Sequence, residues 1–279
     1  MSYLPIGQYG VIGDLHTAAL VGKNGSIDWC CLPRFDSPSV FAALLDHERG
    51  GYWQICPVDQ ATSEQRYLPG TNVLQTVFHL TEGGVLDVTD FMPVGPQRGG
   101  RSRIYRRVRA VRGAPVATIR WEPRFQYGLQ TAVMAVRTHG VLATDRLHDV
   151  ATIASSRPVT WEIQGGVALA VVAIPDEGSV WFAQCFDDDE VEMLEEGACE
   201  ELLKSTIQYW DAWVVLSRYE GPFRKEVERS ALALKLCCYE PSGAIVMSIT
   251  TASRSSPSPR EVRSVESFSG SIGKIPAGV

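Results

Sequence analysis

The stretch from Asn24 to Phe41 constrains the fold most, because a turn, a strand and a charged loop follow one another directly. Asn24-Gly25 is a strong signal for a tight hairpin turn, in which both central residues adopt positive φ. The turn separates two apolar runs, residues 17–21 and residues 26–32. We therefore expect two antiparallel strands joined by this turn.

The chain leaves the second strand in a loop that carries Arg34, Phe35 and Asp36. Ser37-Pro38 then has the cap and proline signature of a helix start, so we expect a helix over residues 39–45. A charged and aromatic loop held between two rigid elements is a frequent location of functional residues.

Residues 52–186 show short apolar runs separated by turn signals. Two clear hairpins are expected, one turning at Glu82-Gly83-Gly84 and one at Gly165-Gly166. Many short antiparallel strands at regular spacing are typical of a large β-sandwich, which we assign to residues 1–186. Its tryptophans at 121, 161 and 181 lie in strand-like runs, and we expect them to pack in the core.

Six arginines fall between Arg101 and Arg112 and alternate with apolar residues, which is the pattern of a half-solvated strand. We expect a solvated sheet face there rather than a nucleic-acid site. The net charge of -6 also gives no general attraction to nucleic acid or to an anionic membrane.

At Asp187 the apolar period changes from two to about 3.6, so we expect a linker helix within residues 187–221 that begins at the acidic run 187–189. Gly221-Pro222 breaks this pattern. A second helix is expected from Phe223 to about Tyr239; at residues 231–238 it becomes apolar nearly all round, as in a helix buried among others. The chain offers few helices to bury it.

The first seven residues lack a basic leader and a long apolar core, and no apolar run reaches membrane-spanning length. The seven cysteines and five histidines show no ligand spacing and no disulfide framework. We therefore expect a cytoplasmic protein with no metal, no cofactor and no membrane or nucleic-acid partner.

Ordered motifs carry a family resemblance over residues 1–246. They include residues 12–21, 25–42, 71–74, 90–93, 123–128, 210–213 and 229–235. Together they resemble the start of microbial glycoside hydrolase family 15 proteins, which include glucoamylases, glucodextranases and trehalases. The resemblance implies a super-sandwich, a helical linker and then an (α/α) barrel that carries both catalytic glutamates.

The resemblance stops shortly after residue 246. Thr250-Thr251 still matches the family, and residues 252–279 are rich in Ser, Arg, Pro and Gly. We expect residues 222–246 to be the first helix of a truncated barrel and residues 247–279 to be a disordered, non-family tail, as a shifted reading frame would produce. No residue then inherits the role of the catalytic glutamates.

Glycosidic hydrolysis with inversion needs two carboxyl groups on either side of the sugar. The carboxylates inside family-like motifs are those of Asp14, Asp28, Asp36 and Asp90, and we expect them to make turn and cap hydrogen bonds instead. Asp28, Trp29, Arg34, Phe35 and Asp36 are the candidate site residues. We expect them to dock the sandwich onto the barrel; the alternative is contact with a sugar from the rim of the active site.

Three functions remain open. The first is a non-catalytic N-terminal domain of a family 15 protein of carbohydrate metabolism, inactive alone, with the missing barrel as its partner. The second is a working α-glucosidase or trehalase, and the third is a stand-alone carbohydrate-binding or interaction module. The resemblance alone suggests an α-glucoside or trehalose as substrate. We favour the first, because the likeness ends inside a helix-loop connection and not at a domain boundary.

Overall fold

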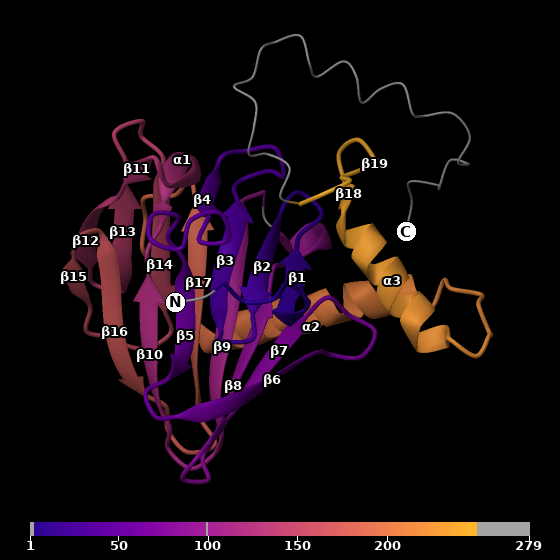
Figure 1. Ribbon diagram of the computed structural model, residues 1–279, viewed down its shortest axis with the longest axis horizontal. Helices are drawn as coiled ribbons and strands as arrows, with labels where there is room; N and C mark the ends of the chain where they lie inside the picture. The colour runs from indigo at the N-terminus through magenta and orange to yellow at the C-terminus, as the bar shows by residue number, and fades with distance from the viewer. Residues whose placement is uncertain (1–2, 99, 250–279) are drawn as a thin grey trace.

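A computed structural model describes residues 3–98 and 100–249, which form a sandwich of two antiparallel sheets (Figure 1). Within these residues each sheet has eight strands, and the predicted mainly β sandwich is confirmed. The expected tail at 252–279 lies outside the described residues.

The first sheet has the order β1-β2-β3-β5-β10-β16-β15, with β4 paired to β3. Its strands are β1 (Tyr9–Gly13), β2 (Ala18–Gly22), β3 (Ser26–Cys31), β4 (Ser39–Phe41), β5 (Trp53–Pro57), β10 (Val116–Trp121), β15 (Glu162–Gln164) and β16 (Val167–Ala173). A short 3-10 helix, η1 (Ile6–Gln8), precedes β1.

The second sheet has the order β12-β13-β14-β17-β9-β8-β7-β6. Its strands are β6 (Ala61–Tyr67), β7 (Leu74–Leu80), β8 (Val85–Phe91), β9 (Arg103–Arg112), β12 (Val133–Arg137), β13 (Gly140–Thr144), β14 (Val150–Ser155) and β17 (Ser179–Phe186). Between strands lie η2 (Gly95–Arg98), the single turn α1 (Phe125–Gly128) and the short β11 (Gln130–Thr131).

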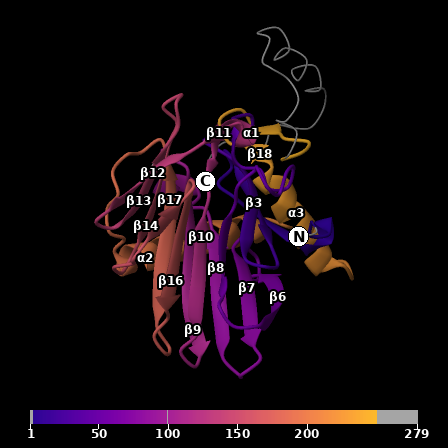
Figure 2. The ribbon, with the colours of Figure 1, turned by 60° about the vertical axis from the view of Figure 1, so that its left-hand side comes forward.

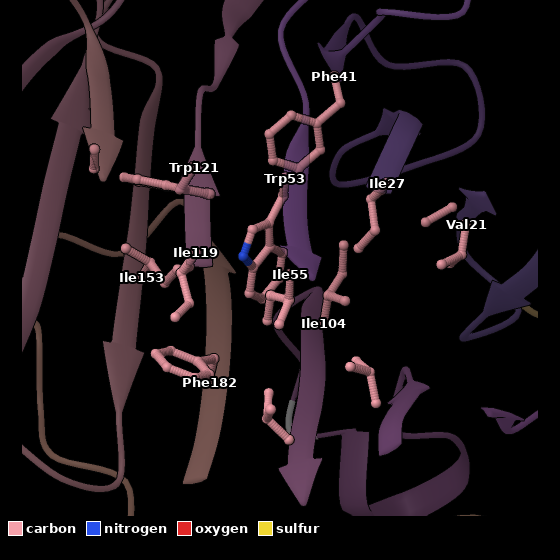
Figure 3. Close-up of a cluster of buried hydrophobic side chains, with 14 of the residues drawn as sticks. Val21, Ile27, Phe41, Trp53, Ile55, Ile104, Ile119, Trp121, Ile153 and Phe182 are labelled. Atoms are coloured by element: carbon pink, nitrogen blue, oxygen red, sulfur yellow. The ribbon is translucent and has the colours of Figure 1, made fainter. Parts of the chain in front are cut away.

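The main core fills the space between the sheets (Figure 3). Apolar residues alternate inward on both sheets, so β5, β9, β10 and β17 each contribute large side chains to it. Trp121 and Trp161 pack there, whereas Trp181 is buried on the outer face of the second sheet. The prediction that these three indoles are packing residues is confirmed.

Two helices follow the sandwich. Helix α2 (Glu196–Val214) covers the outer face of the second sheet, where Cys199 and Leu203 pack on Phe91, Tyr105 and Trp181. Helix α3 (Arg224–Leu236) lies beside β1–β3 and leads into the small hairpin β18 (Cys238–Tyr239) and β19 (Ala244–Ile245). Figure 2 shows α3 at the side of the sandwich, outside both sheets.

The predicted hairpin between β2 and β3 is present, but its turn differs from the expectation. The turn closes where the Gly25 N–H donates to the Gly22 carbonyl over 2.9 Å, and Gly25 has φ 76° while Asn24 has no positive φ. A Cβ on Gly25 would lie 2.1 Å from the Ile55 carbonyl oxygen, so close approach of β5 requires glycine here.

The predicted helix over residues 39–45 is wrong, because Ser39–Phe41 forms β4 and pairs antiparallel with β3. Val40 and Phe41 are buried in the main core. Pairing with β3, which ends at Cys31, therefore outweighs the local helix-start signal of Ser37-Pro38.

The expected solvated arginine face is also wrong in part. Arg106 is fully buried between the sheets, and Arg107 lies beneath α2, paired with Glu200 at 3.1 Å. The expected helix start at 187–189 is displaced as well: α2 begins at Glu196, and Glu195 caps it by accepting the N–H groups of Gly197 and Ala198.

Candidate docking site at the loop end of the sandwich

Strand β3 is buried on both of its faces, which sets the position of two predicted site residues. Ile27 and Cys30 point into the main core. A register shift pairs Leu20 with Trp29 and Val21 with Ile27, so Asp28 is the extra residue of a bulge. Trp29 therefore packs on the outer face of the first sheet.

Asp28 is buried and serves as a hydrogen-bond acceptor. Its carboxylate accepts the Tyr9 hydroxyl at 2.6 Å and the Ser26 hydroxyl at 2.5 Å. Burial, together with the hydrogen bond to Asp28 and its negative charge, raises the pKa of Tyr9. Through its hydrogen bond with Tyr9, Asp28 joins β1 to β3, and through its hydrogen bond with Ser26 it stabilises the start of β3.

Trp29 is fully buried, and its indole Nε1 donates to the Ile249 carbonyl over 2.8 Å. Its ring lies 6.5 Å from that of Tyr127, centroid to centroid, at a tilt of 31°. The indole therefore holds the segment that follows α3 against the sandwich, and it has no free face for stacking on a sugar.

Phe35 anchors the loop after β3 to the helices. Its N–H donates to the His16 carbonyl over 2.9 Å, and its ring meets Tyr239 edge-on at 6.5 Å. It belongs to a second apolar cluster, to which α2 contributes Trp210 and α3 contributes two leucines. The buried members of this cluster are Leu15, Ala18, Phe35, Val94, Trp210, Leu232 and Leu236.

Arg34 and Asp36 form an ion pair on the surface of the same loop. Arg34 Nε lies 3.0 Å from Asp36 Oδ1, and the two side chains are 56% and 75% exposed. Ser37 fixes the turn, because its hydroxyl accepts the Arg34 N–H and its own N–H donates to the Arg34 carbonyl. The structure thus brings Phe35 inward and presents the charged pair to solvent.

A network of hydrogen bonds among mostly buried groups supports the loop after β3. Asp14 accepts the N–H groups of His16 and Thr17 through one oxygen and the Arg98 Nε, at 2.9 Å, through the other. Arg98 also donates to the Ser102 hydroxyl, which in turn donates to the Pro33 carbonyl at 3.0 Å.

Asp14, Asp28, Asp36 and Asp90 therefore all have structural partners. Asp14 pairs with Arg98, Asp36 with Arg34 and Asp90 with Arg106, while Asp28 accepts two hydroxyls. For Asp14 the expected turn hydrogen bonds are confirmed. The thiols of Cys30 and Cys31 are buried, and burial raises the pKa of Cys31 to about 12, so both pack as small apolar groups.

Residues 125–128, noted in the sequence only as part of the family-like motif 123–128, form a second loop at this end of the sandwich. Gln126, Tyr127 and Gly128 adopt consecutive left-handed conformations with φ of 54°, 60° and 82°. Gln126 Nε2 donates to Asp149 Oδ2 over 2.7 Å. The only local signal was the terminal glycine of Phe125-Gln126-Tyr127-Gly128.

Two further findings limit the chemistry of the described residues. They contain no group of three or more His, Cys, Asp or Glu side chains arranged to hold a metal ion. Within the same residues, none of the helices combines the length and the apolar character that crossing a membrane requires.

The sequence model of the family described as trehalase-like, N-terminal, matches residues 2–210, which include both sheets and most of α2. The chain belongs to this family. The resemblance to glycoside hydrolase family 15 is thereby confirmed for the N-terminal portion.

Curated trehalases align with nearly all of this trehalase-like chain. The trehalase of Thermoplasma volcanium is 33% identical over 254 residues, covering 90% of this chain and 40% of its own length. Those of Thermoplasma acidophilum and Mycolicibacterium smegmatis are 31% and 30% identical and cover 84% and 89% of this chain. The chain thus spans about 40% of the length of these relatives.

Proposed function

We propose that this chain is the non-catalytic N-terminal region of a trehalase-type glycoside hydrolase and that its helices dock the helical region which carries the catalytic carboxylates. One observation carries the proposal: at the end of α2, in the segment that joins it to α3, on α3 and after it, several large apolar side chains are exposed among the charged ones. The exposed apolar surface consists of Val215, Leu216, Tyr219, Phe223, Leu234, Ile245 and Met247.

The two faces of these helices have opposite roles. On the inner side Trp210, Leu232 and Leu236 are buried against the sandwich. On the outer side Leu216 is 72% exposed and Met247 is 99% exposed. Several large exposed apolar side chains within one short stretch of the chain are characteristic of a surface that contacts a partner.

Helix α3 is fixed to the sandwich by polar contacts as well. Asn72 Nδ2 donates to the Leu232 carbonyl at 3.1 Å, and Arg229 donates to the Thr71 carbonyl at 2.8 Å. The Arg229 guanidinium also lies 3.9 Å from the ring centroid of Tyr67. A helix held this firmly is able to present its outer face in a defined orientation.

The relatives suggest which partner covers this surface. The chain spans about 40% of the length of the trehalases it matches, so the remainder of such an enzyme is available as the partner. By family resemblance, that remainder is the helical barrel with both catalytic glutamates, and trehalose is the substrate. We also assign the protein to the cytoplasm, on the strength of its seven free thiols.

A second role is supported for the charged pair in the loop after β3. Arg34 and Asp36 are exposed on the loop whose Phe35 packs in the same apolar cluster as Ile249. In an assembled enzyme these two side chains are placed to contact either the barrel or a sugar at its rim.

A chimera tests the proposed function. Residues 1–249 replace the matching region of the Thermoplasma volcanium trehalase, and trehalose hydrolysis is compared between this chimera, the same chimera with Leu216→Glu and Leu234→Glu, and the trehalase without its N-terminal region. We expect activity in the first protein only. Full activity of the shortened trehalase, or of the doubly substituted chimera, would contradict the proposal.

A further inference from the structure

A small pocket opens at the loop end of the sandwich, apart from the exposed apolar surface described above. Its volume is about 110 Å³, and it lies between the segment 32–40, the first residues of α1 and Asp149. Pro33, Val40 and Phe186 supply apolar wall, whereas Ser39, Gln126 and Asp149 supply polar groups.

One buried polar atom at this pocket lacks a hydrogen-bond partner among the described residues. Ser39 lines the pocket and is 1% exposed, and its hydroxyl has no partner there. Buried polar groups are nearly always hydrogen-bonded in folded proteins, so an unpartnered hydroxyl at a pocket indicates a place for a hydrogen-bonding occupant.

The backbone beside the pocket is held in a costly conformation. Gln126 and Tyr127 are non-glycine residues in the left-handed region, each at a cost of order 1–3 kcal/mol. The hydrogen bond from Gln126 Nε2 to Asp149 Oδ2 then places the amide and the carboxylate together at the pocket. Conformations of this kind persist where surrounding structure enforces them and cluster at ligand sites.

The lining determines the class of ligand. It offers a hydroxyl, an amide oxygen and a carboxylate, and it contains no Lys or Arg, so an anion is not favoured. Carboxylate and amide acceptors beside an apolar wall suit the hydroxyl groups of a neutral polyol. Since a water molecule occupies about 30 Å³, the volume takes about four waters, or one edge of a single hexose, and excludes a disaccharide.

We propose that this pocket binds a neutral polyhydroxylated small molecule, a single sugar unit, through Ser39, Gln126 and Asp149. The site belongs to the sandwich itself and does not depend on docking of a catalytic region. Because only one edge of the sugar is enclosed, we expect weak binding, with a Kd on the order of 1 mM or higher.

The test is a titration of the full chain with glucose and with glucose 6-phosphate, followed by amide chemical shifts in ¹⁵N-labelled protein. Ser39→Val and Asp149→Asn remove one polar group each. Ser63→Val, on the far edge strand β6, is the matched control. We expect saturable shifts at residues 37–40 and 126–128 with glucose, weakened at least about tenfold in both pocket variants and unchanged in the control.

Other outcomes overturn the proposal. They are no saturable shift up to about 100 mM glucose, glucose binding that survives both pocket substitutions, or tighter binding of glucose 6-phosphate, which would indicate an anion site. If Ser39→Val does not fold, Asp149→Asn still decides between these results. Loss of glucose binding leaves the chimera experiment unaffected, so failure of this site and failure of the docking proposal are distinguishable.

Discussion

Arg106 and Asp90 lie opposite each other on β9 and β8 and form an ion pair in the centre of the sandwich, with Arg106 Nε 2.8 Å from Asp90 Oδ1. Both side chains are fully excluded from solvent. Arg106 also reaches the other sheet, where it donates to the Trp53 carbonyl at 2.8 Å and the Gly25 carbonyl at 2.7 Å. One side chain thus joins the two sheets.

Replacing Arg106 by methionine keeps most of the side-chain volume and removes the charge. Asp90 is then left as an uncompensated buried carboxylate, and the carbonyls of Trp53 and Gly25 each lose one donor. We expect the free energy of unfolding in urea to fall by about 3–5 kcal/mol. Arg34→Met, at the exposed pair, is the control and should change it by less than about 1 kcal/mol. Equal effects of the two substitutions would show that the buried pair has no special role.

Trp29→Phe removes the indole N–H that binds the Ile249 carbonyl and retains an aromatic ring. We expect residues 244–249 to exchange their amide hydrogens faster, with a loss of global stability on the order of 1 kcal/mol. Trp161→Phe serves as the matched control, because its Nε1 has no hydrogen-bond partner among the described residues. Unchanged exchange in residues 244–249 would refute the role assigned to Trp29.

Asp87 provides a test of pH dependence. Burial raises its pKa, while the hydrogen bond from Gln75 and the charges of Arg107 and Arg109 oppose the rise. The native state therefore holds this proton more tightly than the unfolded chain does. Wild-type stability should fall as pH rises from the ordinary aspartate range, near 3.8, through the raised native pKa.

Asp87→Asn has no proton to lose at this position, so its stability relative to wild type should increase across the same pH window, by about 1.4 kcal/mol for each unit of the rise. Gln75→Leu removes the opposing hydrogen bond and should widen the window. Urea denaturation at several pH values measures both effects. A pH-independent difference between Asp87→Asn and wild type would contradict the assignment.

The exposed apolar surface should make the isolated chain self-associate. Shortening the chain before α3 would uncover Phe35 and Trp210, because Leu232 and Leu236 pack on them, so point substitutions are the cleaner test. Leu216→Glu with Leu234→Glu should lower the sedimentation coefficient at high concentration. Leu129→Glu with Val133→Glu, two exposed apolar residues near β12, is the control. If the control substitutions reduce self-association and the substitutions at Leu216 and Leu234 do not, the self-associating surface lies elsewhere.

The sequence predicted those parts of the fold that local patterns determine. The hairpin that turns at Glu82-Gly83-Gly84 was predicted and joins β7 to β8, since a hairpin needs only adjacent strands and a turn. Ser39–Phe41 could not be assigned in this way, because its partner is β3 and the pairing outweighs a local helix signal. Burial of Arg106 likewise depends on Asp90 from another strand.

The candidate site was predicted as a set of residues and not as a geometry. Phe35 was identified because an aromatic residue in a charged loop stands out, and the structure places it against Tyr239. The contact of Trp29 with Ile249 spans 220 positions and has no local signature. The pairing of Gln126 with Asp149 was missed for the same reason.

Trehalose hydrolysis by the isolated chain tests the central claim most directly. Purified protein is incubated with trehalose, and released glucose is measured against a buffer blank, with Asp28→Asn and Asp36→Asn assayed in parallel. The account predicts no release above the blank for any of the three proteins, since Asp14, Asp28, Asp36 and Asp90 are all engaged in structural contacts. Glucose release by the wild-type chain that is abolished by Asp28→Asn or Asp36→Asn would contradict it and assign catalysis to the sandwich.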